Sequence, residues 1–173
     1  GCVNEDSKTI TIVDLPTANF IADATICLGD DVIFSDLSAG NGSTIIEWEW
    51  DLGDGTASSV QHPTHTYTYA YIYDVSLSVT SEAGCKNDTL IPAFVEVFSL
   101  PIADFGVSTL YASELNPEIS FYNLSQGATV LNWDFDNGQT SLEPNPVVNF
   151  EYVRNYYVQL SVLNNEGCES NII

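Results

Sequence analysis

The chain has 173 residues, of which 24 are acidic and only three are lysine or arginine, so its formal net charge at pH 7 is −21. This charge excludes nucleic acid as a partner, because affinity for phosphate backbones comes from cationic side chains. No apolar run approaches the roughly 20 residues that a membrane helix needs, which argues against membrane insertion. The absence of methionine and of a signal peptide predicts a fragment or a processed product.

The first part of the chain predicts short strands separated by turns. Residues 1–14 are expected to be the tail of a preceding repeat, with Thr9–Val13 as its last strand. Apolar clusters at Ala18–Ile21 and Val32–Phe34 then lie between groups of glycine, asparagine, aspartate, serine and proline, residues that favour turns. This pattern is typical of an antiparallel β protein.

Two longer stretches show the period-2 alternation of half-buried strands. In both, one set of alternating positions is apolar and is expected to face the core: Ile46, Trp48, Trp50 and Leu52, then Tyr73, Val75, Leu77 and Val79. A further strand is predicted at Phe94–Phe98. Because no stretch keeps a helical period over three turns, the sequence predicts an all-β fold.

The chain repeats itself at a constant spacing. The sequence WDLGDG at residues 50–55 returns as WDFDNG at residues 133–138, and at the same spacing Gly84-Cys85 returns as Gly167-Cys168. Repetition at a fixed period indicates tandem modules. With about seven short strands in each, the modules are expected to be antiparallel β-sandwiches, the first of which covers residues 15–99.

The second module is predicted at residues 100–173, after a very short linker around Phe98–Pro101. Its strands are expected at Ile119–Leu124, Leu131–Phe135 and Tyr156–Val162. Only five residues follow its Gly-Cys pair, so this module is expected to lack most of its final strand.

The repeated tryptophan motif is best explained by packing and turn formation. An inward-facing tryptophan on a strand buries a large aromatic surface, and the glycines and carboxylates after it suit a tight turn. A phosphate-binding loop would need a following helix and a lysine, and neither is present. The motif residues are Trp50, Asp51, Gly53, Asp54 and Gly55 in the first module and Trp133, Asp134 and Gly138 in the second.

These motifs resemble the polycystic kidney disease (PKD) domain, an immunoglobulin-like β-sandwich. The resemblance covers Leu15–Val97 and, more loosely, Pro101–Ile173. It is carried by WDLGDG at residues 50–55, PTHTY at 63–67, YDVSLSV at 73–79 and Gly84-Cys85. The chain departs from the family at Tyr71 and Arg154, where a glycine is usual, and its second module lacks the Gly-Asp-Gly turn.

The sequence CLGD at residues 27–30 and the Gly-Cys near the module end resemble PKD repeats of giant Bacteroidetes surface proteins, including gliding-motility adhesins. That resemblance implies an extracellular or cell-surface protein. It also implies cell adhesion as the activity and neighbouring repeats as partners.

The cysteines predict an oxidising compartment. Cys27 and Cys85 lie in one module and are expected to form a disulfide, which would stabilise the module by about 4 kcal/mol. The corresponding region of the second module, Ala112–Glu114, has no cysteine, so Cys168 is expected to have no partner in its own module. The partner of Cys2 is expected in the preceding repeat. The absence of a C-x-x-C pair argues against zinc.

Carboxylates leave a calcium site open as an alternative. Glu47, Glu49 and Asp51 are expected on the outer face of one strand, and further oxygen ligands come from neighbouring loops: Asp30, Asp31, Asp36 and Asn41. Calcium prefers such flexible, oxygen-rich sites. Because no dense D-x-D-x-D-G spacing occurs, a solvated acidic face that maintains solubility is favoured, and no cofactor is expected.

Catalysis is not indicated. His62 and His65 correspond to Asn145 and Val148 in the second module, so both are interpreted as turn residues. No nucleophile with a base can be assigned, and the chain is therefore expected not to be an enzyme.

Thr89 lies in a short Asp-Thr-Leu sequence that resembles a Bacteroidetes O-glycosylation motif. The plainer interpretation is an unmodified threonine on a strand.

The sequence therefore predicts a non-catalytic structural and adhesive stalk of a secreted or cell-surface protein. Its partners would be neighbouring repeats and an extracellular surface, polysaccharide or protein ligand. The alternative is a substrate-binding accessory module of a secreted hydrolase that uses an exposed stripe of Tyr67, Tyr69 and Tyr71. Exchange of the terminal strand between chains is a further possibility.

Overall fold

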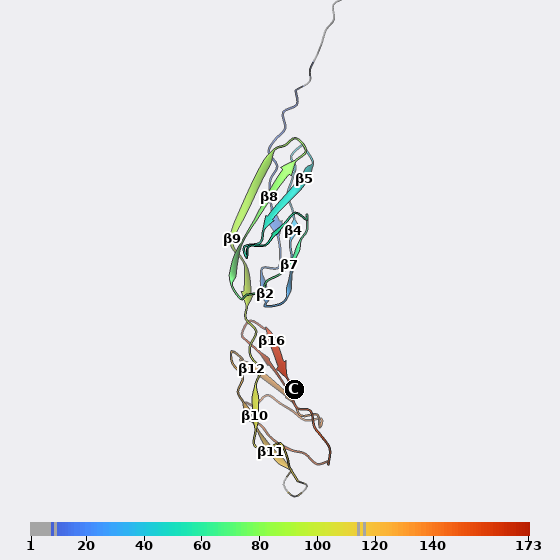
Figure 1. Ribbon diagram of the computed structural model, residues 1–173, viewed down its shortest axis with the longest axis vertical. Coiled ribbons are helices and arrows are strands. Elements are labelled where there is room, and N and C mark those ends of the chain that lie inside the picture. Colours follow the sequence, from blue (N-terminus) through green and yellow to red (C-terminus); the bar gives the residue numbers. More distant parts are fainter. Residues whose placement is uncertain (1–7, 9, 114, 116) are drawn as a thin grey trace, which may run out of the picture. The chain divides into compact units, whose positions relative to one another are not determined.

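The computed structural model describes residues 8, 10–113, 115 and 117–173, which form strands and loops (Figure 1). Cys2 and Thr9 lie outside the described residues. The chain divides into two compact units, with unit 1 ending at Val97 and unit 2 beginning at Phe98. None of the described residues belongs to a helix that could cross a lipid bilayer.

Unit 1 contains a five-stranded sheet faced by two smaller strand pairs. The order in the large sheet is β2-β9-β8-β5-β6, and the pairs are β1-β4 and β3-β7. The strands are β1 (Phe20–Ile21), β2 (Thr25–Cys27), β3 (Asp31–Ile33), β4 (Ser35–Asp36), β5 (Ile45–Asp51), β6 (Ala57–Ser58), β7 (Thr64–Thr66), β8 (Ile72–Ser81) and β9 (Lys86–Phe98).

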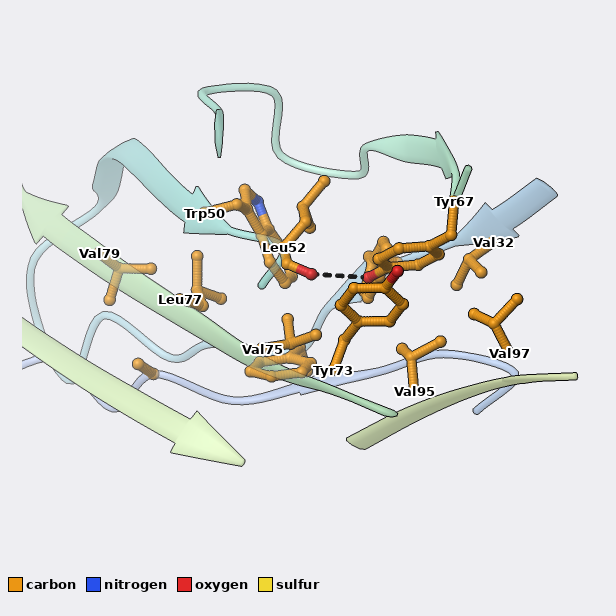
Figure 2. Packing of buried hydrophobic residues seen from close by; sticks show 13 residues of the cluster. Val32, Trp50, Leu52, Tyr67, Tyr73, Val75, Leu77, Val79, Val95 and Val97 are labelled. Carbon is orange, nitrogen blue, oxygen red and sulfur yellow. Dashed lines mark hydrogen bonds between the residues drawn. The ribbon is translucent and has the colours of Figure 1, made fainter. Parts of the chain in front are cut away.

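The core of unit 1 surrounds Trp50, as the sequence predicts. The indole is 2% exposed, and the ring of Phe20 meets it edge-on with ring centroids 5.1 Å apart. Figure 2 shows the alternating apolar residues of β8 and β9 converging on the same interior as Tyr67 and Leu52. Burial of these alternating faces is what holds the sandwich together.

The predicted inward face of β5 is wrong at one position. A β-bulge between Ile45 and Glu47 adds one residue to β5 relative to β8, so that Ile46 has no partner across the ladder. Consequently Ile45 packs against the core, and the side chain of Ile46 is 54% exposed. Trp48 and Trp50 keep their predicted orientation because they follow the bulge.

Unit 2 repeats the plan with fewer paired residues. One sheet has the order β13-β12-β15-β16 and the other β10-β11-β14. The core contains Trp133, which is 0% exposed. The strands are β10 (Phe105–Val107), β11 (Glu118–Asn123), β12 (Val130–Asp134), β13 (Thr140–Ser141), β14 (Val147–Asn149), β15 (Gln159–Leu163) and β16 (Glu169–Ile172). The all-β sandwich fold that the sequence predicts is confirmed.

The predicted disulfide between Cys27 and Cys85 is wrong. Cys85 carries a free thiol, whereas Cys27 and Cys168 each take part in a disulfide bond. The reason is distance along β9. Cys85 directly precedes this strand, whereas Cys27 lies beside its other end, where the Glu96 amide donates to the Ala24 carbonyl. Strand geometry separates these ends by roughly 30 Å, and a disulfide requires Cα atoms within about 7 Å.

Candidate functional site

The turn after β5 is built by the repeated motif of unit 1. The Trp50 indole N–H donates to the Val60 carbonyl at 2.9 Å, which fixes the ring while it fills the core. The Asp51 carboxylate accepts from the Gly53 amide at 3.0 Å, and the Asp54 carboxylate accepts from the Thr56 amide at 2.9 Å. Both carboxylates therefore hold the turn through backbone hydrogen bonds, as predicted from turn chemistry.

Gly53 is required by the geometry of this turn. Its φ is +87°, and a Cβ placed on it would lie 2.2 Å from the Asp74 carbonyl oxygen at the start of β8. Such a contact is sterically impossible without moving the backbone. The glycine thus lets β8 pass close beneath the turn.

Asp54 and His65 form an enclosed hydrogen-bonded pair in unit 1. The His65 Nε2–H donates to Asp54 Oδ2 at 2.7 Å, and the side chains of His65 and Asp54 are 14% and 18% exposed. Burial acts to raise the pKa of Asp54, but the hydrogen bonds from His65 and Thr56 outweigh it and lower that pKa below its usual value. His65 is the central residue of strand β7, so its interpretation as a turn residue is wrong. From this strand its side chain bonds to the turn after β5.

Tyr67 completes the support of this turn from inside the core. Its hydroxyl donates to the Leu52 carbonyl at 2.8 Å, drawn as the dashed line in Figure 2. Burial, followed by the charge of Asp54, raises the pKa of Tyr67, so the phenol stays protonated as a donor. Its ring stacks on that of Tyr73 with centroids 4.3 Å apart.

Unit 2 builds the same turn with different side chains. The Trp133 indole donates to the Glu143 carbonyl at 2.9 Å. Asp134 accepts from the Asp136 amide at 2.9 Å, and Asn137 accepts from the Gln139 amide at 2.9 Å. The loss of the Gly-Asp-Gly sequence therefore leaves the turn intact, because an asparagine oxygen accepts the same backbone bond as the carboxylate of Asp54.

Asp136 occupies the position of Gly53 with a φ of +55°. Its carboxylate accepts from Arg154 Nη1 at 2.8 Å, and the Arg154 guanidinium lies over the Tyr156 ring at 4.1 Å from its centroid. This hydrogen bond with Arg154 lowers the pKa of Asp136. A cationic side chain thus stabilises this turn, where unit 1 uses a histidine.

The four predicted metal-ligating residues are separately engaged in hydrogen bonds. Asp36 accepts from the Trp48 indole at 2.7 Å and from Gln61 at 3.0 Å, while Asn41 donates to the Leu15 carbonyl at 2.8 Å. Asp30 accepts from the Cys27 amide at 3.3 Å, and Asp31 accepts from the Thr66 hydroxyl. Within the described ranges, no three His, Cys, Asp or Glu side chains gather closely enough to hold a metal.

The outer carboxylates of β5 are exposed as expected. Glu49 forms an ion pair with Lys86 across the sheet.

Thr89 is half-buried on β9 directly opposite Leu77, whose side chain is buried. Because opposite residues of an antiparallel pair share a face, the Thr89 side chain points to the inner face, an unfavourable position for a bulky modification.

The predicted tyrosine stripe is wrong in its first member. Tyr67 is 1% exposed and belongs to the core, whereas Tyr69 and Tyr71 are 75% and 69% exposed. The segment between β7 and β8 bends after Thr66, so period-2 alternation does not apply to it. Only Tyr69 and Tyr71 remain available for contact with a ligand.

Unit 2 contains a groove that sequence reasoning did not identify as a site. It encloses about 460 Å³ and is lined by aromatic and aliphatic side chains together with Arg154. Two of its tyrosines, Tyr152 and Tyr157, are 74% and 71% exposed.

The comparisons assign the family of unit 1. Residues 13–94 match the family model described as a PKD domain. The PKD1 domain of Vibrio anguillarum Epp is 33% identical to this chain, and the match covers 100% of that domain and 50% of this chain with a TM-score of 0.45. The chain belongs to the PKD family. The PKD1 domain from the Vibrio cholerae metalloprotease PrtV is similar at 29% identity, over 99% of that domain and 48% of this chain, with a TM-score of 0.43.

A third similarity extends beyond the PKD domain. A structure of carbohydrate-binding modules from the β-sandwich superfamily matches 93% of this chain and 90% of its own at 13% identity and a TM-score of 0.48. A likeness at this level identifies no ligand for the chain.

Proposed function

We propose that the chain is a non-catalytic structural and adhesive segment of a large secreted or cell-surface protein, where it acts as a stalk that projects a binding region. PKD domains are generally accessory modules. The observation that carries the proposal is that the motif residues of unit 1, including Asp51, Asp54 and His65, are engaged in holding turns. The disulfide-bonded state of Cys27 and Cys168 supports an oxidising, extracellular location.

In this proposal, unit 2 is a second PKD-like module, and the module boundaries are those inferred from the repeat, 15–99 and 100–173. Its support is the repeated turn around Trp133, which matches the turn around Trp50 in the indole hydrogen bond and in the two side-chain bonds to backbone amides. The tandem arrangement is the kind that the sequence resembles in Bacteroidetes surface adhesins. A chain of such modules transmits force through long-range strand pairing, and its lifetime under load depends on the unfolding rate.

Single-molecule pulling tests the mechanical role. In a reducing buffer, which opens the disulfide bonds of Cys27 and Cys168, we expect two separate unfolding steps, one for each unit. Unit 2 should open first, because its β15 pairs with β16 over four residues whereas β8 and β9 of unit 1 pair over eight. A single cooperative step, or the opening of unit 1 before unit 2, would contradict the proposed modular stalk.

A second candidate function is a substrate-binding accessory module of a secreted hydrolase. The exposed Tyr69 and Tyr71 favour it, since solvent-exposed aromatic side chains often contact polysaccharide or fibrous protein. The PKD1 domain of PrtV, which is described as belonging to a metalloprotease, is a related case. Binding in a glycan array or a collagen pull-down that Tyr69→Ala abolishes and Tyr69→Phe preserves would support this candidate, whereas inert behaviour would favour the stalk.

A further inference from the structure

The chain contains two Asn-Gly pairs, Asn41-Gly42 and Asn137-Gly138. An asparagine that precedes glycine can react with its own backbone, because the glycine amide nitrogen attacks the side-chain Cγ and closes a five-membered ring. Glycine favours this ring closure since it has no Cβ to obstruct it and its backbone rotates freely. Folding fixes the attacking nitrogen and the side chain in each pair, so the structure determines which of the two pairs reacts.

The attacking nitrogen is accessible at Gly138. This glycine is exposed in the turn between β12 and β13, and no atom lies within 4 Å of the position that a Cβ would occupy. None of the described residues accepts a hydrogen bond from its amide. Gly55, its counterpart in unit 1, is equally open, so this openness is a property of the turn in both units.

The side chain of Asn137 is held in a way that activates it. Its Oδ1 accepts a hydrogen bond from the Gln139 amide at 2.9 Å. This oxygen gains negative charge when Cγ is attacked, and a backbone N–H aimed at such an oxygen stabilises the charge, as in an oxyanion hole. The departing nitrogen, Nδ2, donates to the Asn149 carbonyl at 3.4 Å, which is longer than a usual N–H···O bond. Both features promote the loss of ammonia.

Asn41 is bonded in the opposite way. Its Nδ2 donates to the Leu15 carbonyl at 2.8 Å and to the Thr17 hydroxyl at 2.9 Å. Both bonds must break before this nitrogen can leave, and two bonds of ordinary strength slow such a step by about 10-fold. Asn41 is the more exposed of the two asparagines. Exposure alone would therefore select Asn41, whereas the hydrogen bonds select Asn137.

The corresponding turn of unit 1 lacks the reactive amide. Asp54 stands where unit 2 has Asn137, and its carboxylate accepts hydrogen bonds from the Thr56 amide and from His65. An ionised carboxylate resists attack by a nucleophile and has no ammonia to release. Of the two repeated turns, that of unit 2 alone therefore carries this chemistry.

We propose that Asn137 of the folded chain is a site of spontaneous deamidation. The Gly138 amide gives its proton to hydroxide, and its nitrogen forms a bond to Cγ of Asn137. The Cγ–Nδ2 bond then breaks, and Nδ2 takes up a proton from water and leaves as ammonia. Water opens the resulting succinimide ring. Cleavage of the new N–Cγ bond gives aspartate, the residue of unit 1, whereas cleavage at the backbone carbonyl gives isoaspartate.

Both products change the turn of unit 2. Each adds a negative charge next to Asp136 and removes the Nδ2 donor from the Asn149 carbonyl. Isoaspartate also lengthens the backbone by one carbon atom, which displaces the oxygen that accepts from the Gln139 amide. Unit 2 should therefore lose stability as the chain ages.

Incubation of the whole chain at mildly alkaline pH, followed by peptide mapping with mass spectrometry, tests the proposal. Trypsin separates the two Asn-Gly pairs because Lys86 lies between them. In buffer, Asn137 should react about 10-fold faster than Asn41, whereas in concentrated urea the two rates should be similar. No reaction at Asn137, a rate there no higher than that of Asn41 in buffer, or suppression of the Asn137 reaction by folding would overturn the proposal.

A matched pair of variants links the reaction to the stability of unit 2. Asn137→Ser keeps an oxygen that can accept from the Gln139 amide but has no amide to lose, and Asn41→Ser makes the same change at the other pair. During incubation the melting temperature of unit 2 should fall in the unchanged chain and in Asn41→Ser, and it should stay constant in Asn137→Ser. Asn137→Asp gives the stability of the aspartate product. An equal decline in Asn137→Ser would show that the ageing arises elsewhere.

Discussion

The two units contain the same tryptophan turn but differ in the strand beneath it. In unit 1, β8 has ten residues and is paired along its length with β9, whereas its counterpart β15 in unit 2 has five. The residues that correspond to the first part of β8 are present in unit 2, and Tyr156 even repeats the bond of Tyr73, its hydroxyl donating to the carbonyl of the residue four positions earlier. Among the described residues of unit 2, β16 pairs with Leu160–Leu163, and residues 155–158 belong to no strand.

The longer β8 of unit 1 explains why the turn of unit 1 requires glycine, whereas the turn of unit 2 accepts aspartate. In unit 1, β8 brings the Asp74 carbonyl directly beneath Gly53. In unit 2 the corresponding residue, Tyr157, precedes β15, and Asp136 adopts a positive φ with its Cβ present. The paired strand β8 thus leaves no room for a Cβ in the turn of unit 1, whereas the segment before β15 leaves room for the side chain of Asp136.

The largest expected effect is the loss of either core tryptophan. Trp50→Ala and Trp133→Ala should each reduce the free energy of unfolding of their own unit by about 3–5 kcal/mol, since a large buried ring is removed. Urea titrations followed by methyl NMR signals of Leu77 and Leu160 would report the units separately. Tyr69→Ala, at an exposed position, is the control. Equal destabilisation of both units by one substitution would show that they share a single core.

The second largest effect is a loss of stability that should differ between the two turns. Gly53→Ala should destabilise unit 1 by about 2–4 kcal/mol, because a side chain at this positive φ is strained and meets the Asp74 carbonyl. Asp136→Ala in unit 2 loses an exposed ion pair with Arg154 and a hydrogen bond from the Tyr157 amide, so we expect less than about 1.5 kcal/mol. Thermal unfolding of both variants measures the contrast, and equal effects would refute the role assigned to β8.

A smaller effect concerns the buried hydroxyl that only unit 1 possesses. Tyr67→Phe should cost about 1–2 kcal/mol, since it leaves the Leu52 carbonyl without its donor. Unit 2 has Phe150 at this position, which carries no hydroxyl and cannot form the corresponding hydrogen bond. Chemical denaturation gives the value. Tyr69→Phe should remain within about 0.5 kcal/mol of the unchanged chain, and a similar loss there would argue against the specific bond.

The smallest effect is the pH dependence that Asp54 gives to the stability of unit 1. The pKa of Asp54 is lowered in the folded state, so its contribution to stability is present above the unfolded pKa near about 4 and is lost as pH falls through the folded pKa. Asp54→Asn removes this contribution, as Asn137 does naturally in unit 2. The free energy of unfolding of unit 1 between pH 5 and pH 2 should therefore fall less steeply in the variant. An unchanged slope would mean that Asp54 gains nothing from His65.

Several features could be predicted from the sequence because they depend on local pattern. The burial of Trp50 and Trp133 follows from alternation along a strand, and the turn after each follows from short polar side chains that can bond nearby amides. Ile46 and Tyr67 were assigned wrongly by the same rule. A bulge shifts the first, and a bend after β7 turns the second into the core.

The repeat, the β class and the chemistry of the turns can be inferred from the amino-acid sequence, because they depend on interactions between residues close along the chain. Tertiary structure alone decided that Cys27 and Cys85 stand at opposite ends of β9, that Gly53 must admit β8, and that unit 2 has an open groove. These outcomes depend on which strands lie side by side. Pairing between residues far apart in sequence leaves no local pattern from which it can be inferred.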